Sequence, residues 1–263
     1  ERMNKVEKIL NNYYNTYDEE SRLIKDKAHS IEYLTTTNYI DKYLNSKNRI
    51  LEVGAGTGRY SITYASKGFK VDSVELVDRN LKLLKSKITK DMKINAMHGN
   101  CMNLNMYEDN TFDVTLVLGP LYHLFKEKDI EKAIKEAIRV TKKEGKIFIA
   151  YITSDAVVMS YGLRKKNLKK LKELCDDDWN IPKVEEEIFA TFRIEDFNKL
   201  IKQFKVKHLE TIATDGIALQ MQEYINKLDD EEFKIYVDYH LKNCKRKDLI
   251  GYSSHILEIL EKE

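Results

Sequence analysis

The stretch from Ile50 to Gly58 constrains the fold more than any other. It reads Ile-Leu-Glu-Val-Gly-Ala-Gly-Thr-Gly, so a short apolar segment runs directly into glycines at every second position. A helical pattern follows at once, and Gly68 is suited to end that helix. A strand, a glycine turn and a helix in this order form a nucleotide site in open parallel sheets. The glycines admit a ligand close to the backbone, and the helix N-terminus adds free N–H donors.

The composition is that of a globular protein with no membrane span. The chain has 263 residues, enough for one large α/β domain with insertions. It contains no apolar run of about 18 residues, the length that crosses a bilayer. A net charge of +2 is too small to indicate nucleic-acid binding. Three widely spaced cysteines and the lack of a secretory leader predict a cytoplasmic protein without a disulfide framework.

Apolar strands alternate with amphipathic helices through the first half of the chain. This alternation predicts a doubly wound α/β fold, a mostly parallel seven-stranded sheet with helices on both faces. We expect Asp78 to cap the second of these helices, and Gly145 to end a helix over 129–143. The segments expected as strands are 49–53, 70–75, 93–98, 112–118, 146–152, 205–212 and 255–260.

The flanking segments are expected to close over the carboxyl edge of the sheet. Residues 1–45 are predicted to form an N-terminal helical lid, whose apolar stripe includes Tyr13, Tyr14 and Tyr17. Residues 46–263 form the main domain, with cap insertions at about 153–190 and 215–250. The stripe is equally explained by simple docking on the domain. Arg22 in the connector is either a solvated charge or a clamp for a ligand carboxylate.

Two cofactors compete for the glycine turn. The dinucleotide pattern Gly-x-Gly-x-x-Gly requires a third glycine where this chain has Arg59, and its third glycine lies at Gly58 instead. Glu52, inside the strand, would gain nothing by facing a pyrophosphate. It suits a site with a cation, ordered water or amine donors.

The run from Glu52 to Gly58 resembles motif I of the class I S-adenosylmethionine-dependent methyltransferases, especially the UbiE-like small-molecule type. The resemblance covers 30–152 and extends more weakly to the C-terminus. It implies that Glu75 takes both ribose hydroxyls, that the loop at Asn100 receives adenine and that the turn after Leu118 holds the methionine amine. Asn100 replaces the commoner Asp. The residues assigned to S-adenosylmethionine are Glu52, Gly54, Ala55, Gly56, Gly58, Glu75, Leu76, Asn100, Cys101, Met102, Leu118 and Arg22.

The segment Gly119–His123, Gly-Pro-Leu-Tyr-His, is the most informative about the methyl acceptor. It resembles the Asn/Asp-Pro-Pro-Tyr motif of amino-group methyltransferases, but Gly119 removes the oxygen that would hold the amine. Tyr122 and His123 are the candidate catalytic residues, since histidine is the natural base near neutral pH. Both also pack equally well as core residues. Tyr17, Tyr122, His123 and Tyr151 are the candidate substrate contacts, and no metal is expected because no acidic ligands follow this strand.

The sequence therefore predicts methyl transfer from S-adenosylmethionine to the O, N, S or C atom of a small molecule. Such a transfer is an in-line displacement in which the protein chiefly aligns the reactants. The alternatives are an RNA or protein methyltransferase and a cofactor-binding protein without catalysis. We expect no membrane or nucleic-acid partner, and a monomer or homodimer.

Overall fold

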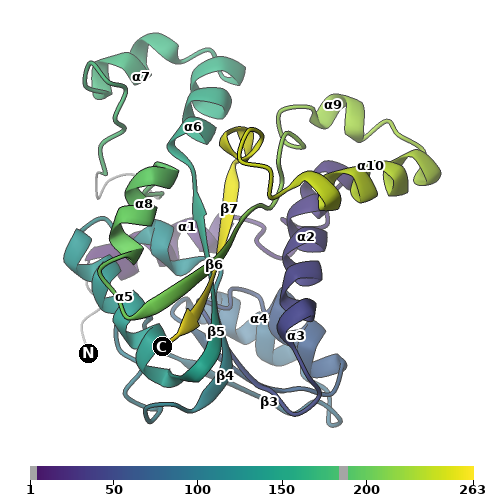
Figure 1. Ribbon diagram of the computed structural model, residues 1–263, viewed down its shortest axis with the longest axis vertical. Coiled ribbons are helices and arrows are strands. Elements are labelled where there is room, and N and C mark those ends of the chain that lie inside the picture. The colour runs from purple at the N-terminus through teal and green to yellow at the C-terminus, as the bar shows by residue number, and fades with distance from the viewer. Residues whose placement is uncertain (1–4, 184–188) are drawn as a thin grey trace.

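The computed structural model describes residues 5–183 and 189–263 and contains one open, seven-stranded sheet (Figure 1). The strand order is β3-β2-β1-β4-β5-β7-β6. The first five strands in this order are parallel, and β7 runs antiparallel to both β5 and β6. This confirms the predicted doubly wound, mostly parallel sheet. The strands are β1 (Arg49–Val53), β2 (Lys70–Glu75), β3 (Ile94–His98), β4 (Phe112–Val117), β5 (Thr141–Ile152), β6 (Val206–Ala213) and β7 (His255–Lys262).

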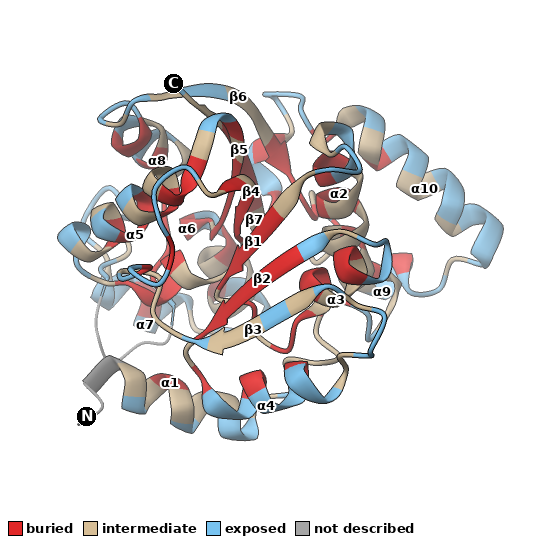
Figure 2. Cartoon of the chain, turned by 90° about the horizontal axis from the view of Figure 1, so that it is seen from below, coloured by how far each residue is buried: buried red, intermediate tan, exposed pale blue. Residues whose placement is uncertain are grey.

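Helices cover both faces of the sheet. Figure 2 shows α5 and α8 on one side of the strands and α2 and α3 on the other. The α-helices are α1 (Lys5–Thr16), α2 (Lys27–Tyr43), α3 (Arg59–Ser66), α4 (Asp78–Ser86), α5 (Glu127–Val140), α6 (Ser154–Val157), α7 (Leu168–Leu174), α8 (Ile194–Ile201), α9 (Gln222–Ile225) and α10 (Asp230–Asn243). The 3₁₀ turns are η1 (Pro120–His123) and η3 (Ile250–Tyr252), and η2 (Val158–Arg164) is a π-helix.

The core lies on the central strands, which are buried on both faces (Figure 2). Ile50 and Leu51 of β1 are both fully buried although their side chains point to opposite sides of the sheet. This explains why β1 and β4 read as continuous apolar runs rather than alternating ones. The buried centre fixes the carboxyl ends of β1, β2 and β4, from which the candidate site is built.

Two predicted helix boundaries are wrong. Helix α5 ends at Val140 and β5 begins at Thr141, whose hydroxyl donates to the carbonyl of Ala137 at 2.6 Å. Gly145 therefore does not end the helix; it lies where the β4–β5 register shifts, next to Glu144 with φ of +61°. The N-cap of α4 is Val77, and Asp78 is the first helical residue.

The late segments form two arms beyond the sheet. Helices α9 and α10 pack on α2, around a small core that includes Ala28, Ile31 and Ile225. Helices α6 and α7 form the other arm with η2 (Figure 1). The predicted insertion at 153–190 lies partly outside the described residues. Within 5–183 and 189–263, no helix has the length and apolarity required to cross a bilayer.

Candidate functional site

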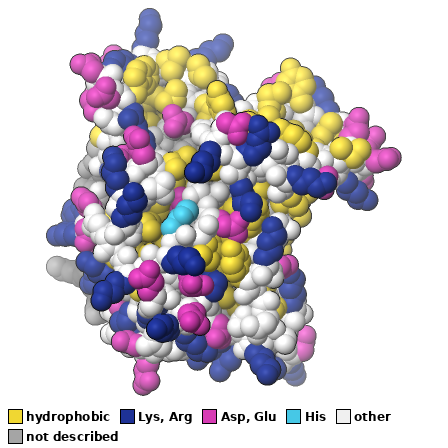
Figure 3. Space-filling view, in the orientation of Figure 1, with side chains coloured by type: hydrophobic (Ala, Val, Ile, Leu, Met, Phe, Trp, Pro, Cys, Tyr) yellow, Lys and Arg dark blue, Asp and Glu magenta, His cyan; other side chains and the backbone are white. Residues whose placement is uncertain are grey.

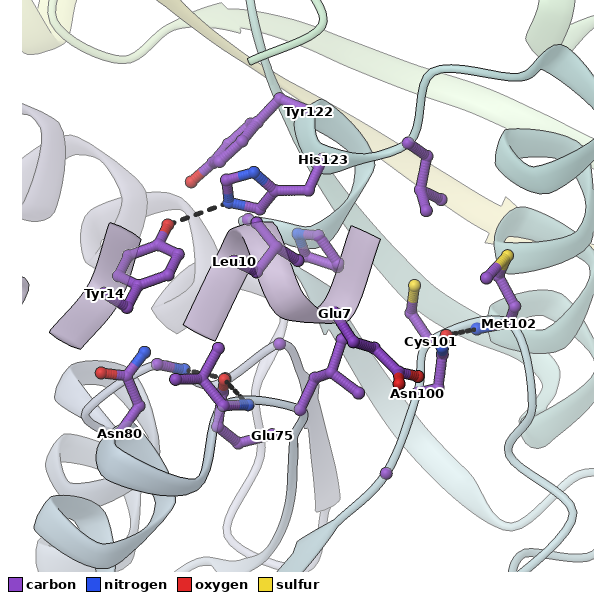
Figure 4. A pocket seen from close by; sticks show the side chains of 18 of the residues that line it. Glu7, Leu10, Tyr14, Glu75, Asn80, Asn100, Cys101, Met102, Tyr122 and His123 are labelled. Atoms are coloured by element: carbon purple, nitrogen blue, oxygen red, sulfur yellow. Dashed lines mark hydrogen bonds between the residues drawn. The ribbon is translucent and has the colours of Figure 1, made fainter. Parts of the chain in front are cut away.

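A cavity of about 370 Å³ opens at the carboxyl ends of β1, β2 and β4, with α1 across it (Figure 4). Its floor is the glycine turn after β1, and one wall carries Glu75 from the end of β2. The opposite side is formed by the turn η1 after β4. Three separate βα connections thus converge on one space, as expected at the edge of a parallel sheet.

The glycine turn is shaped by positive φ angles at all three of its glycines. Gly54 has φ of +70° and Gly56 has φ of +55°, values that favour glycine. A Cβ added to Gly54 would lie 2.8 Å from Cδ of Pro120. The lack of a side chain therefore lets the turn after β4 pack directly on the turn after β1, so that the two sequence motifs share one cavity.

Glu75 lies at the base of the cavity with its carboxylate fixed by backbone donors. One oxygen accepts from the N–H of Gly56 at 2.7 Å and the other from the N–H of Val77 at 2.7 Å (Figure 4). Burial raises the pKa of Glu75, and the two N–H donors oppose that rise. Each carboxylate oxygen has a second lone pair, so the group can also accept bonds from a pair of ligand hydroxyls.

The loop from Asn100 to Met102 forms another wall of the cavity. The side-chain oxygen of Asn100 accepts from the N–H of Met102 at 2.9 Å, which holds the loop in a tight turn (Figure 4). Leu76 and Cys101 line the same side. The predicted adenine loop thus reaches the cavity, with one Asn100 lone pair already engaged by its own backbone.

Cys101 is expected to resist alkylation in the folded protein. Burial raises the pKa of its thiol to about 12, so at pH 8 only about one molecule in 10⁴ carries the reactive thiolate. Iodoacetamide at pH 8 should leave Cys101 unmodified in mass spectra, whereas the same treatment in concentrated urea should modify it. Rapid labelling of the folded protein would show instead that Cys101 is an activated nucleophile.

Glu52 and Gly58, both predicted to contact the cofactor, are turned away from the main cavity. Glu52 is buried beneath α3 and accepts bonds from the N–H and hydroxyl of Ser61. Burial raises the pKa of Glu52 to about 8, and the Ser61 donors lower it. Gly58 packs against Leu84 of α4. Gly58 supports the turn from below and lines neither cavity, whereas Glu52 also lines a smaller recess beside the turn.

Ala55, Leu118 and Arg22 lie around a smaller recess of about 40 Å³ between the two turns. Arg22 is held between two carboxylates, with its Nε 3.1 Å from Glu19 and its Nη1 2.9 Å from Glu32. These partners hold the pKa of Arg22 well above its usual range despite burial. Arg22 is thus a paired cation, 19% exposed, rather than a freely solvated one.

Tyr122 and His123 lie at the border of the main cavity (Figure 4). The hydroxyl of Tyr14 from α1 is hydrogen-bonded to Nε2 of His123 at 2.9 Å. The ring of Phe189 lies 5.4 Å from that of His123 and 5.8 Å from that of Tyr122. An aromatic wall therefore joins α1 to the turn after β4.

A second recess of about 220 Å³ lies beyond this wall. Tyr14, Glu19 and Tyr122 line both spaces, and the predicted Tyr17 lines the second. The second recess also contains residues that the sequence did not single out, namely Glu32, Asp215 and His255. The sequence does hold a signal for two of them. Asp215 follows the end of β6 and His255 begins β7. In a pair of antiparallel strands, the end of one strand lies beside the start of the other, at the same edge of the sheet.

Tyr151 does not reach either space. It is fully buried, its hydroxyl donates to Glu258 at 3.0 Å and its ring stacks on Phe197 with centroids 4.2 Å apart. The prediction followed from its place near the end of a strand. Because side chains alternate along a strand, this one points to the face that α8 covers. Tyr151 is a core residue.

Comparison with known proteins matches the middle of the chain, which carries the strands of the site, to a family. Residues 50–145 match the family described as a methyltransferase domain. This segment is a methyltransferase domain of the S-adenosylmethionine-dependent kind. It is 28% identical to a glycine/sarcosine N-methyltransferase of Aphanothece halophytica, over 49% of this chain and 52% of that one. It is 26% identical to a ubiquinone biosynthesis O-methyltransferase of Rickettsia typhi, over 61% and 64%.

The solved structures share the fold of this methyltransferase domain. A S-adenosylmethionine-dependent methyltransferase of Methanosarcina mazei is 17% identical, with a TM-score of 0.57 over 85% of this chain and 96% of that one. The chain spans about half the length of the curated relatives it matches. These similarities confirm the resemblance inferred from residues 52–58, and with it S-adenosylmethionine as the cofactor of the domain.

Proposed function

We propose that the protein transfers a methyl group from S-adenosylmethionine to a small-molecule acceptor. The observation that carries this proposal is the shared cavity of Glu75, the glycine turn and the Tyr122–His123 segment. The cofactor supplies a methyl group on a sulfonium, which leaves readily in an in-line displacement. The protein then has to bind, align and dehydrate the reactants, and alignment alone can contribute several kcal/mol.

The lining residues suit the parts of this cofactor. Glu75 offers two oxygens to the ribose hydroxyls, and its N–H partners hold it in place. Leu76 and the loop at Asn100 fit the adenine, which needs an apolar face and a few polar contacts. Gly54 and Gly56 let the methionine portion lie close to the backbone, with Leu118 beside it. Arg22 uses three of its five N–H donors on Glu19 and Glu32, so two remain for the cofactor carboxylate.

The second recess supports a small acceptor. Tyr14 and Tyr122 border both this recess and the cofactor cavity, and its volume of about 220 Å³, below that of a typical drug-sized pocket, suits a small acceptor. On the face in Figure 3, Lys and Arg are interspersed with Asp and Glu, without the concentrated basic surface typical of RNA-binding proteins. A reducing compartment such as the cytoplasm suits its three free cysteines.

Calorimetry and a transfer assay test this function. S-adenosylhomocysteine should bind, and NAD should not, because the site lacks the third glycine of the dinucleotide pattern. Tritiated S-adenosylmethionine should then label small acceptors rather than bulk RNA or protein. Binding of NAD alone would refute the cofactor proposal, and transfer only to macromolecules would favour the alternative acceptor class.

His123→Ala is expected to lower turnover by about tenfold to 100-fold, with little change in cofactor binding. His123 lines the main cavity and is hydrogen-bonded to Tyr14, which borders both the cavity and the second recess, so we propose that it orients the acceptor where the two spaces meet. A general base typically accelerates a reaction by roughly 10²–10⁴-fold. A loss of turnover near 100-fold across pH 6 to 9 would therefore assign proton transfer to His123 as well. Unchanged turnover would exclude both roles. Tyr14→Phe, which removes one partner of His123, should give a smaller loss in the same direction.

A further inference from the structure

The second recess carries an excess of negative charge among the side chains that are largely shielded from water. Three carboxylates line it, from Glu19, Glu32 and Asp215. Asp215 has 1% of its side chain exposed, Glu32 has 13% and Glu19 has 20%. Arg22, which is 19% exposed and bound to Glu19 and Glu32, is the cation that faces them. The remaining basic groups of the lining are His255, His29, which bonds to Asp26, and the exposed Lys25.

His255 offsets only part of this charge. Its Nδ1 donates to Asp215 at 2.7 Å and lies 3.6 Å from the carboxylate of Glu32. A protonated His255 and Arg22 together still supply one cation fewer than the three carboxylates, Glu19, Glu32 and Asp215. Because these carboxylates are largely shielded from water, the recess favours a ligand that brings positive charge.

The rest of the lining also suits a cation. The rings of Tyr14, Tyr17, Tyr122 and Phe189 face the recess, and aromatic faces attract ammonium groups. The recess has two chemically different ends. Tyr14, Glu19 and Tyr122 border both the recess and the cofactor cavity. Glu32, Asp215 and His255 line the recess but not the cofactor cavity. The carboxylate-rich end thus lies away from the shared wall.

We infer that this recess binds the methyl acceptor through a positively charged amino group. The ammonium lies against Glu32 and Asp215 and serves as an anchor, and the nucleophilic atom at the other end of the acceptor points past Tyr122 toward the cofactor. The acceptor is accordingly a small bifunctional amine. The inference rests on the proposed function, since it needs the cofactor in the adjoining cavity.

A matched series of ligands tests the inference. Tyramine, tyrosol and 4-hydroxyphenylacetate share a phenol and differ in an ammonium, a hydroxyl or a carboxylate at the other end. Calorimetry on the full chain saturated with S-adenosylhomocysteine should show tyramine binding at least tenfold more tightly than tyrosol, with the carboxylate weakest. Equal binding of the three, tighter binding of tyrosol or the carboxylate, or no binding of any of them contradicts the inference.

Variants locate the charge that selects the amine. Glu32→Gln keeps an acceptor for Arg22 but removes the negative charge, so the preference for tyramine over tyrosol should fall close to one. His208→Gln is the control, because His208 pairs with the carboxylate of Glu258 at 2.7 Å outside the recess. This variant should keep the preference for tyramine over tyrosol. A preference that survives Glu32→Gln, or that disappears after EDTA treatment as expected for a bound metal ion, overturns the inference. Failure to bind S-adenosylhomocysteine at all would instead refute the proposed function.

Discussion

Glu75→Ala is expected to weaken S-adenosylhomocysteine binding by roughly 100-fold to 1,000-fold. A hydrogen bond to a charged group contributes about 1.5–3 kcal/mol, and Glu75 is proposed to make two of them to the ribose. Roughly 3–4 kcal/mol corresponds to two to three powers of ten in the dissociation constant. Part of the loss has a second source, because the same carboxylate holds the N–H groups of Gly56 and Val77.

Calorimetry measures this effect, and two further variants separate its parts. Asp78→Ala removes an acid three residues away whose side chain is 73% exposed, and it should leave the affinity unchanged. Glu75→Gln keeps one oxygen that can accept from a backbone N–H, so it should lose less affinity for S-adenosylhomocysteine than Glu75→Ala. If Glu75→Ala bound S-adenosylhomocysteine like the unaltered protein, the assignment of this cavity to the cofactor would be wrong.

The fold was predictable where one local pattern determines each element. The segments 49–53 and 70–75 become strands with the predicted bounds, because each is a short segment between turn residues in a regular alternation of strand and helix. The C-terminal end of α5 was not predictable, because Gly145 looks like a helix stop. The chain instead begins β5 at Thr141, which pairs with Phe112 of β4. This strand pairing is more favourable than extending the helix by three residues.

The cofactor side of the site was also largely accessible from the sequence, since Glu75 and the loop at Asn100 lie directly after strands. The second recess was not. His255 and Asp215 are 40 residues apart in the sequence, and Glu32 comes from a helix before the first strand. Only the antiparallel placement of β7 beside β6, and the packing of α2 near that edge, bring them together. The prediction that Tyr151 contacts the substrate was wrong for a related reason. The place of a residue near the end of a strand does not determine which face of the sheet its side chain points to.

Gly58→Ala is expected to destabilise the protein by about 2–4 kcal/mol, the largest stability effect we predict for a single methyl group. Gly58 has φ of +84°, and the left-handed region costs a residue with a side chain roughly 1–2 kcal/mol. A Cβ there would lie 2.1 Å from Cδ1 of Leu84, and overpacking of a core costs typically 1–3 kcal/mol. Urea denaturation measures the sum as a lower midpoint with an unchanged slope.

Gly68→Ala isolates the backbone contribution. Gly68 has a similar φ of +90°, but a Cβ there would meet nothing within 4 Å. Its cost should therefore be about 1–2 kcal/mol, the conformational part alone. The double variant Gly58→Ala, Leu84→Ala tests the remaining part, because removing the Leu84 side chain removes the clash while creating a cavity. The double variant should lose less free energy of unfolding than the two single variants lose in sum. Equal costs at Gly58 and Gly68 would mean that α3 and α4 do not need their close approach, and that the third glycine of the motif serves backbone conformation alone.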